Sequence, residues 1–454
     1  MAKRILTIAA VVAASSLMLS GCAASDTTEA DTTTVNFRLW DETVAKAYEA
    51  SFDEFEEQNP NIKVNINVVP WADYWSKLRT DVASGTMDDV YWINNSYYGA
   101  YVDSGNLMDV GAVMGSAAAE AWEPSVVDQF TRNGTLWGVP QLYDAGIAVY
   151  YNADILEAAG VTPEQLNDLS WNPEKPDKEK QSGDQAAADS YLEVARKLTL
   201  DSSGKAGDAK GFDGDSVEQY GTNIAYDLQA ILLPFIGSNG GAFQKGDEFA
   251  FAGEKSAKAI NYLVQAINKY HVAPSAADTN DDGDFSLNAF TQGKMAMFQS
   301  GLYNLKNVSE GADFDWGVAM LPAGPEGRVS VTNGIVAAGN AASEKKDAVK
   351  KVLGWLGSEQ GNAYLGVDGA AVPGVVAAQD TYFDYWSKKD VDVSPFFDVV
   401  SDGKTIPAPT GPNYSKGYEK FDPIFKEIFA GTVKPLDGLE QAQAEANGAI
   451  GSGN

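Results

Sequence analysis

Two short groups of aromatic and acidic side chains stand where ligand chemistry could occur. Trp40, Asp41 and Glu42 directly follow an alternating apolar segment, and Trp71 directly follows a second one. Carboxylates accept directional hydrogen bonds from hydroxyl groups, and indole rings offer flat apolar faces. Large aromatic residues dominate cores as well as interfaces, so each tryptophan could instead simply cap the hydrophobic core.

An acidic run at residues 278–284 resembles the opening of an EF-hand calcium loop. The twelfth position of such a loop needs a bidentate glutamate, and this chain has Ala289 there. We therefore expect a solvated turn, and apart from calcium at this run we expect no cofactor. The weak calcium candidates are Asp278, Asn280, Asp282 and Asp284.

Nucleophilic catalysis and a Cys/His zinc site would both have to use His271, the only histidine. This residue follows an amphipathic helical pattern, where a cation near a helix C-terminus is the ordinary explanation. A glycosidase needs only two carboxylates, which Asp41, Glu42 and Asp144 could supply. Release of shorter sugars on prolonged incubation would distinguish that enzyme from a binding protein.

The elements that would position these residues alternate between strands and helices. Val35, Phe37 and Leu39 predict a strand, and Val64, Ile66 and Val68 predict another. Between them, apolar residues recur at helical spacing until Asn59-Pro60. This order implies a parallel sheet covered by helices, in which ligands bind beyond the carboxyl ends of the strands. The first helix is predicted from Val44, Tyr48, Phe52 and Phe55, and later helices from Ile260, Leu263, Val264 and Ile267 and from Val349, Val352, Leu353 and Leu356.

The first 21 residues read as a signal peptide. Lys3 and Arg4 precede an apolar run that is too short for a transmembrane helix, and the run ends in Leu-Ser-Gly-Cys at residues 19–22. This sequence matches a bacterial lipobox, so we expect Cys22, the only cysteine, to carry the lipid. Residues 22–34 would be a flexible tether, which places the protein on the outer face of the cytoplasmic membrane.

The net charge of the chain limits the classes of molecule that it can bind. Without Lys3 and Arg4, 31 basic residues stand against 63 acidic ones, a formal net charge of −32. Such a surface repels phosphate backbones, so nucleic acid is not expected as a partner. Because no second cysteine exists for a disulfide, stability must come from a large apolar core, and the length suits two domains.

Several segments, taken in order, resemble the family 1 extracellular solute-binding proteins of ABC importers, the group that includes maltose-binding protein. Each fragment is weak by itself, but together they cover nearly all of residues 35–430. The segments are Pro-Trp-Ala-Asp-Tyr-Trp-Ser-Lys-Leu (70–78), Ala-Ser-Gly-Thr-Met-Asp-Asp-Val-Tyr-Trp (83–92), Tyr-Val-Asp-Ser-Gly-Asn-Leu-Met-Asp (101–109), Gly-Val-Pro-Gln-Leu-Tyr-Asp (138–144), Tyr-Tyr-Asn-Ala-Asp-Ile-Leu (150–156), Ala-Gly-Val (159–161), Phe-Thr-Gln-Gly-Lys-Met-Ala-Met (290–297) and Gly-Val-Ala-Met-Leu-Pro (317–322).

The resemblance implies a periplasmic-binding-protein-like α/β fold, with two lobes that close over a ligand about a hinge. The N-terminal lobe would comprise residues 35–142 and 320–370, and the C-terminal lobe residues 143–319 and 371–454. The chain would cross near residues 141–144, 318–321 and 369–376. Two insertions, at 172–185 and 201–217, read as surface loops.

The resemblance also implies carbohydrate capture by a monomer that delivers its ligand to an ABC permease. A non-sugar solute such as a peptide remains an alternative. Aromatic rings would cover the apolar faces of sugar rings, while carboxylates, amides and backbone groups would bind hydroxyls. The implied contacts are Trp40, Asp41, Glu42, Trp71, Asn95, Tyr97, Asp144, Asn239, Tyr303, Asn333, Gly334 and Tyr418, with Tyr226 and Trp386 as looser guesses.

Overall fold

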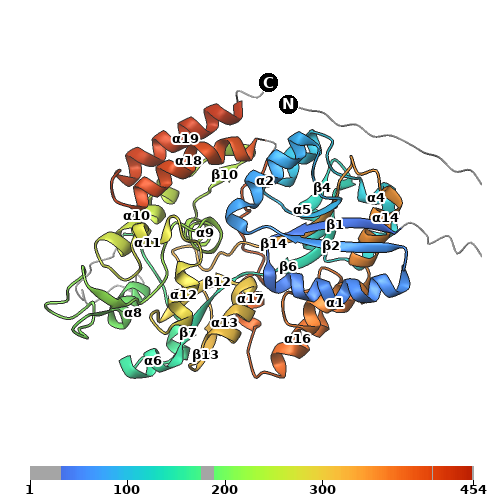
Figure 1. The fold of residues 1–454 in the computed structure, drawn as a ribbon. Coiled ribbons are helices and arrows are strands. Elements are labelled where there is room, and N and C mark those ends of the chain that lie inside the picture. Colours follow the sequence, from blue (N-terminus) through green and yellow to red (C-terminus); the bar gives the residue numbers. More distant parts are fainter. Residues whose placement is uncertain (1–31, 175–188, 412, 452–454) are drawn as a thin grey trace, which may run out of the picture.

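The computed structural model describes residues 32–174, 189–411 and 413–451 (Figure 1). Cys22, the signal segment, most of the tether and most of the 172–185 insertion lie outside the described residues, so these expectations stay predictions. Within the described part, no helix has the length and apolar character needed to cross a bilayer.

The first lobe is built on a five-stranded mixed sheet in the order β2-β1-β3-β14-β6. The two predicted strands are confirmed, because β1 pairs in parallel with both β2 and β3. Strand β14 runs antiparallel to its neighbours β3 and β6. It alone enters this sheet from the other lobe, so no helical crossover within the sheet forces it to be parallel. The strands are β1 (Thr33–Leu39), β2 (Ile62–Val68), β3 (Val90–Asn94), β6 (Val139–Asp144) and β14 (Asn333–Gly339).

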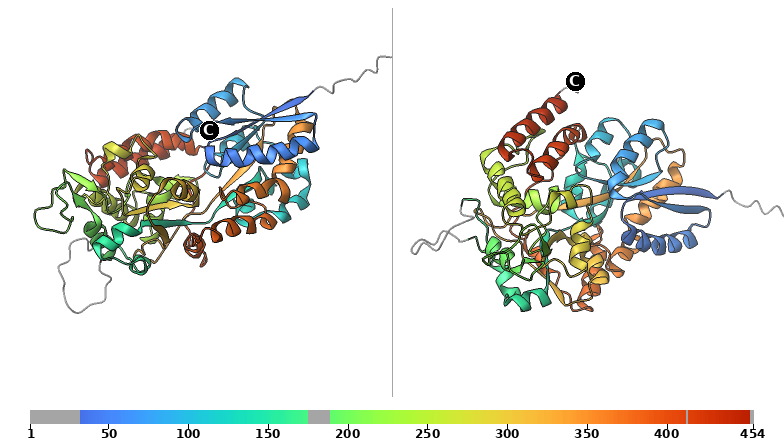
Figure 2. Two further views of the ribbon diagram at one scale, coloured as in Figure 1. Left: turned by 60° about the horizontal axis from the view of Figure 1, so that its bottom comes forward. Right: turned by 60° about the vertical axis from the view of Figure 1, so that its left-hand side comes forward.

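Helices cover both faces of this sheet (Figures 1 and 2). The predicted first helix is α1, and its apolar positions Val44, Tyr48, Phe52 and Phe55 are all buried. It packs against β1 and against helices from much later in the chain, for example against Trp355 of α14. The main helices of this lobe are α1 (Glu42–Gln58), α2 (Trp71–Ser84), α3 (Tyr98–Asp103), α4 (Val110–Met114), α5 (Pro124–Phe130), α14 (Lys346–Leu356) and α15 (Glu359–Val367).

The second lobe surrounds a smaller antiparallel sheet in the order β12-β7-β13. In its large core, Phe243 packs against Phe421 and Phe425 of α18 (Tyr414–Phe429), which pairs with α19 (Pro435–Gly451). The strands are β7 (Ile147–Asn152), β12 (Met297–Gly301) and β13 (Trp316–Ala319). The helices of this lobe include η2 (Leu228–Leu232, a π-helical turn), α9 (Leu233–Ser238), α10 (Glu254–Asn268), α11 (Ala276–Thr279), α12 (Phe285–Thr291), η3 (Leu302–Asn304), α13 (Leu305–Gly311), α17 (Ser394–Asp398), α18 (Tyr414–Phe429) and α19 (Pro435–Gly451). Helix α16 (Asp380–Ser387) packs against α15 of the first lobe.

The chain passes between the two sheets in short connections. Only residues 145–146 separate β6 of the first sheet from β7 of the second. The return path occupies residues 320–332, between β13 and β14, and the predicted return at 318–321 falls at its start. Residues 372–375 then run beside β6, where Gly374 donates its N–H to the Gln141 carbonyl. The exact lobe boundaries stay a prediction.

Candidate functional site

One edge of the first sheet collects most of the predicted binding residues. Strands β1, β2, β3 and β6 all end at this edge, and the antiparallel strand β14 begins there. Asp41, Trp71 and Asn95 follow three of these strand ends, while Asp144 is the last residue of β6. The topology therefore brings together side chains that are more than a hundred residues apart in sequence.

Asp41 is the N-cap of α1. Its Oδ1 accepts the backbone N–H groups of Thr43 at 2.8 Å and Val44 at 2.9 Å. This cap does not use Oδ2, which stays available as an acceptor. Burial raises the pKa of Asp41, while the two N–H groups and the nearby Lys306 lower it. Glu42, in the first turn of the same helix, is exposed.

Asp144 stands opposite Asn333 in the β6–β14 register. Burial, followed by the charge of Asp41, raises the pKa of the Asp144 carboxyl to about 7. Asn333 is only 8% exposed, and its side-chain oxygen is buried without a hydrogen-bond partner. A buried polar atom without a partner costs free energy unless another group satisfies it. Asp144 and Asn333 together therefore form a polar pair suited to an incoming donor.

The second lobe places Tyr303 near the carboxyl group of Asp144, and Asp227 near the hydroxyl of Tyr303. Gly301 ends β12 opposite Ile147, three residues after Asp144, so Tyr303 in η3 lies next to the crossing between the sheets. The carboxylates of Asp227 and Asp144 both act on the Tyr303 hydroxyl, whose pKa is raised mainly by burial. Sequence reasoning missed Asp227. Its position before an apolar run signals an N-cap, which it is for η2, but nothing local signals a binding role.

The aromatic residues of the first lobe form a connected group. The rings of Trp40 and Trp71 meet edge to face with their centroids 5.3 Å apart, and Trp71 meets Trp75 at 5.4 Å. Trp71 is 50% exposed, whereas Trp75 is buried. Trp71 therefore presents an exposed indole surface at this edge of the first sheet, and its contact with solute stays a prediction.

Truncation of Trp71 to alanine should weaken solute binding by about 1–2 kcal/mol, because an exposed aromatic contact surface is lost. The free energy of unfolding should change by less, since half of the ring is already in water. Calorimetric titration and thermal unfolding measure the two quantities separately. The opposite pattern, with stability lost and affinity kept, would contradict a binding role.

Comparison with known proteins shows the family of this chain. The family model described as "Bacterial extracellular solute-binding protein" matches residues 40–363. The chain belongs to this family. The resemblance drawn from the sequence, with its two-lobed α/β fold, is thereby confirmed.

Solved structures of similar solute-binding proteins cover almost the whole chain. UspC from M. tuberculosis is 52% identical, with a TM-score of 0.70 over 92% of this chain and 100% of UspC. The ABC substrate-binding protein Lmo0181 from Listeria monocytogenes, in complex with cycloalternan, is 20% identical, with a TM-score of 0.76 over 93% and 100% of the two chains. MalE from Bdellovibrio bacteriovorus, bound to maltotriose, is 16% identical, with a TM-score of 0.72 over 92% and 100%.

Several residues that were predicted to contact solute instead form hydrogen bonds or packing contacts within the protein. Gln129, which the sequence did not single out, accepts hydrogen bonds from the Gly334 N–H at 3.0 Å and the Asn95 amide at 3.4 Å. A Cβ at Gly334 would lie 2.6 Å from a methyl group of Val126, so close packing alone requires this glycine. The Gly334 N–H is therefore not free for solute.

Asn239 lies in a different part of the second lobe. Its amide donates to the Lys255 carbonyl at 2.6 Å and thereby joins the end of α9 to the start of α10. The looser guess Trp386 is fully buried, and Tyr226 packs on Phe425 and Phe429. The structure gives these three residues packing roles within the protein.

The acidic run does not form an EF-hand loop. Asp278 lies within α11, where its carboxylate accepts from the Ser275 hydroxyl, and Asp284 precedes α12. Asn280 donates to the Lys426 carbonyl. Across the three described ranges, no group of three or more Asp, Glu, His or Cys side chains could hold a metal ion. Calcium binding stays an untested prediction that this geometry does not favour.

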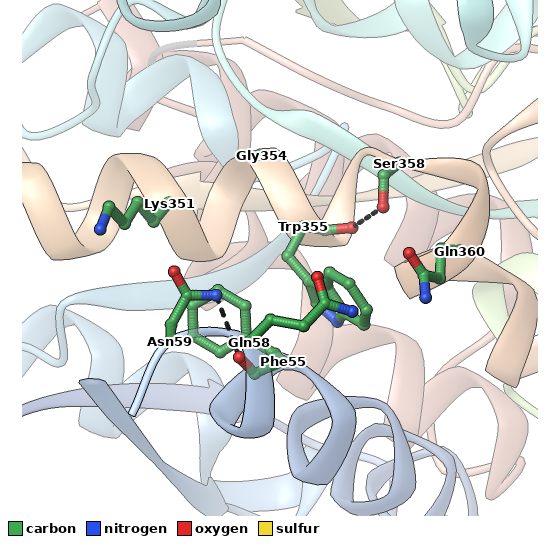
Figure 3. Close-up of a pocket in the computed structure, with 8 residues that line it drawn as sticks. All are labelled: Phe55, Gln58, Asn59, Lys351, Gly354, Trp355, Ser358 and Gln360. Carbon is green, nitrogen blue, oxygen red and sulfur yellow. Dashed lines mark hydrogen bonds between the residues drawn. The ribbon is translucent and has the colours of Figure 1, made fainter. Parts of the chain in front are cut away.

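One pocket of about 330 Å³ lies far from the binding edge (Figure 3). It is shallow, and Phe55, Gln58 and Asn59 at the end of α1 line it together with residues of α14 and α15. Asp41 stands at the opposite end of this 17-residue helix. A rise of 1.5 Å per residue separates the pocket from Asp41 by roughly 25 Å, so the pocket is not part of the candidate site.

Proposed function

We propose that this solute-binding protein captures a carbohydrate, in the first place an oligosaccharide, between its two lobes and delivers it to an ABC permease. The observation that carries the proposal is the convergence of Asp41, Asp144 and Tyr303, from both lobes. Trp71 stands half exposed at the same edge of the first sheet. Carboxylates bind sugar hydroxyls, and aromatic rings cover sugar C–H faces. The saccharides bound by Lmo0181 and by the Bdellovibrio MalE support the same ligand class.

The protein acts as a carrier and performs no chemistry on the solute. Its single histidine adopts a left-handed backbone (φ 54°), and its ring lies against Gly214. Cys22 anchors the mature monomer by its lipid to the outer face of the cytoplasmic membrane. The closed form is selected by the contacts that solute adds across the lobes.

Calorimetric titration of a chain that starts after Cys22 tests this proposal. The panel contains maltose, maltotriose, mannotriose, monosaccharides and a peptide mixture, with calcium present and absent. Saturable binding of one saccharide class, with chromatography showing the sugar intact after long incubation, is the expected result. Binding of peptides alone, or release of shorter sugars, would overturn the proposal.

Closure should also be visible in solution. We expect small-angle scattering to give a radius of gyration that does not increase when saccharide saturates the protein. If the free protein is partly open, the radius should decrease on binding. A larger radius with bound saccharide would contradict capture by closure.

A further inference from the structure

Two of the residues predicted to bind sugar, Asn95 and Tyr97, instead join the lobes directly. The ring of Tyr97 stacks on Trp75 with centroids 3.8 Å apart and planes at 9°, so one face of Tyr97 is covered within its own lobe. Its edge meets Tyr414 of α18 at 5.5 Å and 83°. Tyr97 therefore packs against the hydrophobic clusters of both lobes. Tyr418 lies one turn further along α18, next to Tyr414.

Polar contacts run alongside this aromatic contact. Thr410 donates its hydroxyl to the Asn95 carbonyl at 2.7 Å. Gln244 of the second lobe holds Thr410 in place by two hydrogen bonds to its backbone. Arg79 of α2 forms an ion pair with Glu419 of α18 at 3.4 Å. Figures 1 and 2 show α2 and α18 side by side where these contacts form.

These contacts are separate from the carboxylates of the binding edge. The charge of Asp41 acts on the carboxyl of Asp144, whereas Tyr97 and Tyr414 pack against each other. Arg79, Asp422 and Glu419 act on the hydroxyl of Tyr97, whose pKa is raised mainly by burial. Two distinct groups of side chains thus span the lobes, and one of them consists of protein–protein contacts alone.

We propose that this second group is a clasp that sets solute affinity by holding the lobes closed, without touching the solute. The clasp consists of Arg79, Asn95 and Tyr97 in the first lobe and Thr410, Tyr414 and Glu419 in the second. Its residues favour the closed form whether or not solute is present. Apparent affinity scales with the fraction of protein in the binding-competent form, so the clasp raises affinity and slows solute release.

The inference extends the proposed function, but its test needs no sugar. The measured quantity is the closed fraction of the solute-free protein, from electron-spin distances between one spin label on each lobe, in a chain that starts after Cys22. The described residues contain both lobes and every clasp contact. The variant Arg79→Glu places two negative charges together and should lower the ratio of closed to open protein by about 3- to 10-fold.

The double variant Arg79→Glu/Glu419→Arg restores opposite charges and should recover the closed fraction. The control Lys255→Glu breaks an ion pair of 2.9 Å with Glu326, a residue of the return connection whose N–H donates to the Ser238 carbonyl of the second lobe, and should leave the distances unchanged. Because both clasp charges are partly exposed, 0.5 M salt should weaken the difference between the wild type and Arg79→Glu. Tyr97→Ala should open the lobes further, since an aromatic contact is lost.

An open wild-type protein, or a double variant as open as Arg79→Glu, would overturn the clasp. Loss of the closed fraction in Lys255→Glu would overturn it as well, because the effect would then be general. These outcomes are distinct from failure of the proposed function. A clasp can close a receptor for another solute, and a carbohydrate receptor can bind without one.

Discussion

Replacing Asp144 with asparagine should stabilise the protein above pH 7 and at the same time weaken solute binding. In the unfolded chain this carboxyl ionises near its ordinary pKa of 3.8, whereas in the folded protein its pKa is about 7. Between these values the folded state holds a proton that the unfolded state has lost. The stability therefore falls as the pH rises through this window, and the loss is complete above about pH 7.

The full pKa shift corresponds to about 4 kcal/mol, and partial contact of Asp144 with solvent reduces the expected gain for Asp144→Asn to about 2 kcal/mol. Denaturant unfolding at pH 5 and pH 8 measures it. The variant should gain most stability at pH 8 and less than half as much at pH 5, where the unfolded chain is already ionised but the folded carboxyl still holds its proton. Asp208→Asn, at an exposed position, is the matched control. If the free energy of unfolding had the same pH dependence in the wild type and in Asp144→Asn, ionisation of Asp144 would not destabilise the folded protein.

The same substitution should weaken binding of the saccharide found in the titration panel by about 10- to 100-fold, the value of a hydrogen bond to a charged acceptor. A residue that lowers stability while improving binding is characteristic of a functional site. A stable variant with unchanged affinity would exclude Asp144 from the solute contacts.

Adding a methyl group at Gly301 should weaken binding almost as much as removing the ring of Tyr303. A Cβ at Gly301 would overlap the aromatic carbons of Tyr303, so the ring must move away. Tyr303→Ala should cost about 1–3 kcal/mol of binding free energy, as expected for a lost aromatic contact. Tyr303→Phe keeps the ring and should retain most of the affinity.

Gly354→Ala is the control for the Gly301 variant, because a Cβ at this helical position meets no atom within 4 Å. Calorimetry with the same saccharide compares the affinity of the wild type with that of the four variants. Full affinity in both Gly301→Ala and Tyr303→Ala would remove Tyr303 from the site and leave the carboxylates to bind solute without it.

Local patterns predicted the elements that depend on local sequence. The alternation in β1 and the helical spacing in α1 were sufficient, because each element buries the face that its pattern marks. The antiparallel direction of β14 and of the second sheet was not predicted, since it depends on connections between lobes. Asp41 and Trp71 were predicted because strand ends mark the ligand-binding edge of such a sheet, and Asp144 was predicted from the family resemblance. Their contact with solute stays a prediction.

The remaining site assignments depended on contacts that no local pattern encodes. Asp227 lies near Tyr303 but looks in sequence like an ordinary helix start. Gln129 binds the Gly334 N–H but looks like an ordinary residue on a helix surface. Tyr97 and Asn95 were predicted as ligand contacts, and the structure shows them bound to protein groups of the other lobe. An aromatic residue in a ligand-binding loop and one in a lobe contact have the same sequence signature.

The contact between Trp71, Trp40 and Trp75 gives the protein a built-in optical reporter. Three indoles lie within 5.6 Å of one another, centroid to centroid, and Trp71 is half exposed to water at the binding edge. Solute that covers Trp71 will remove water from this indole and shift the emission of the whole group to shorter wavelength. Uptake and release could therefore be followed in real time, without a label, while the protein is docked on its permease.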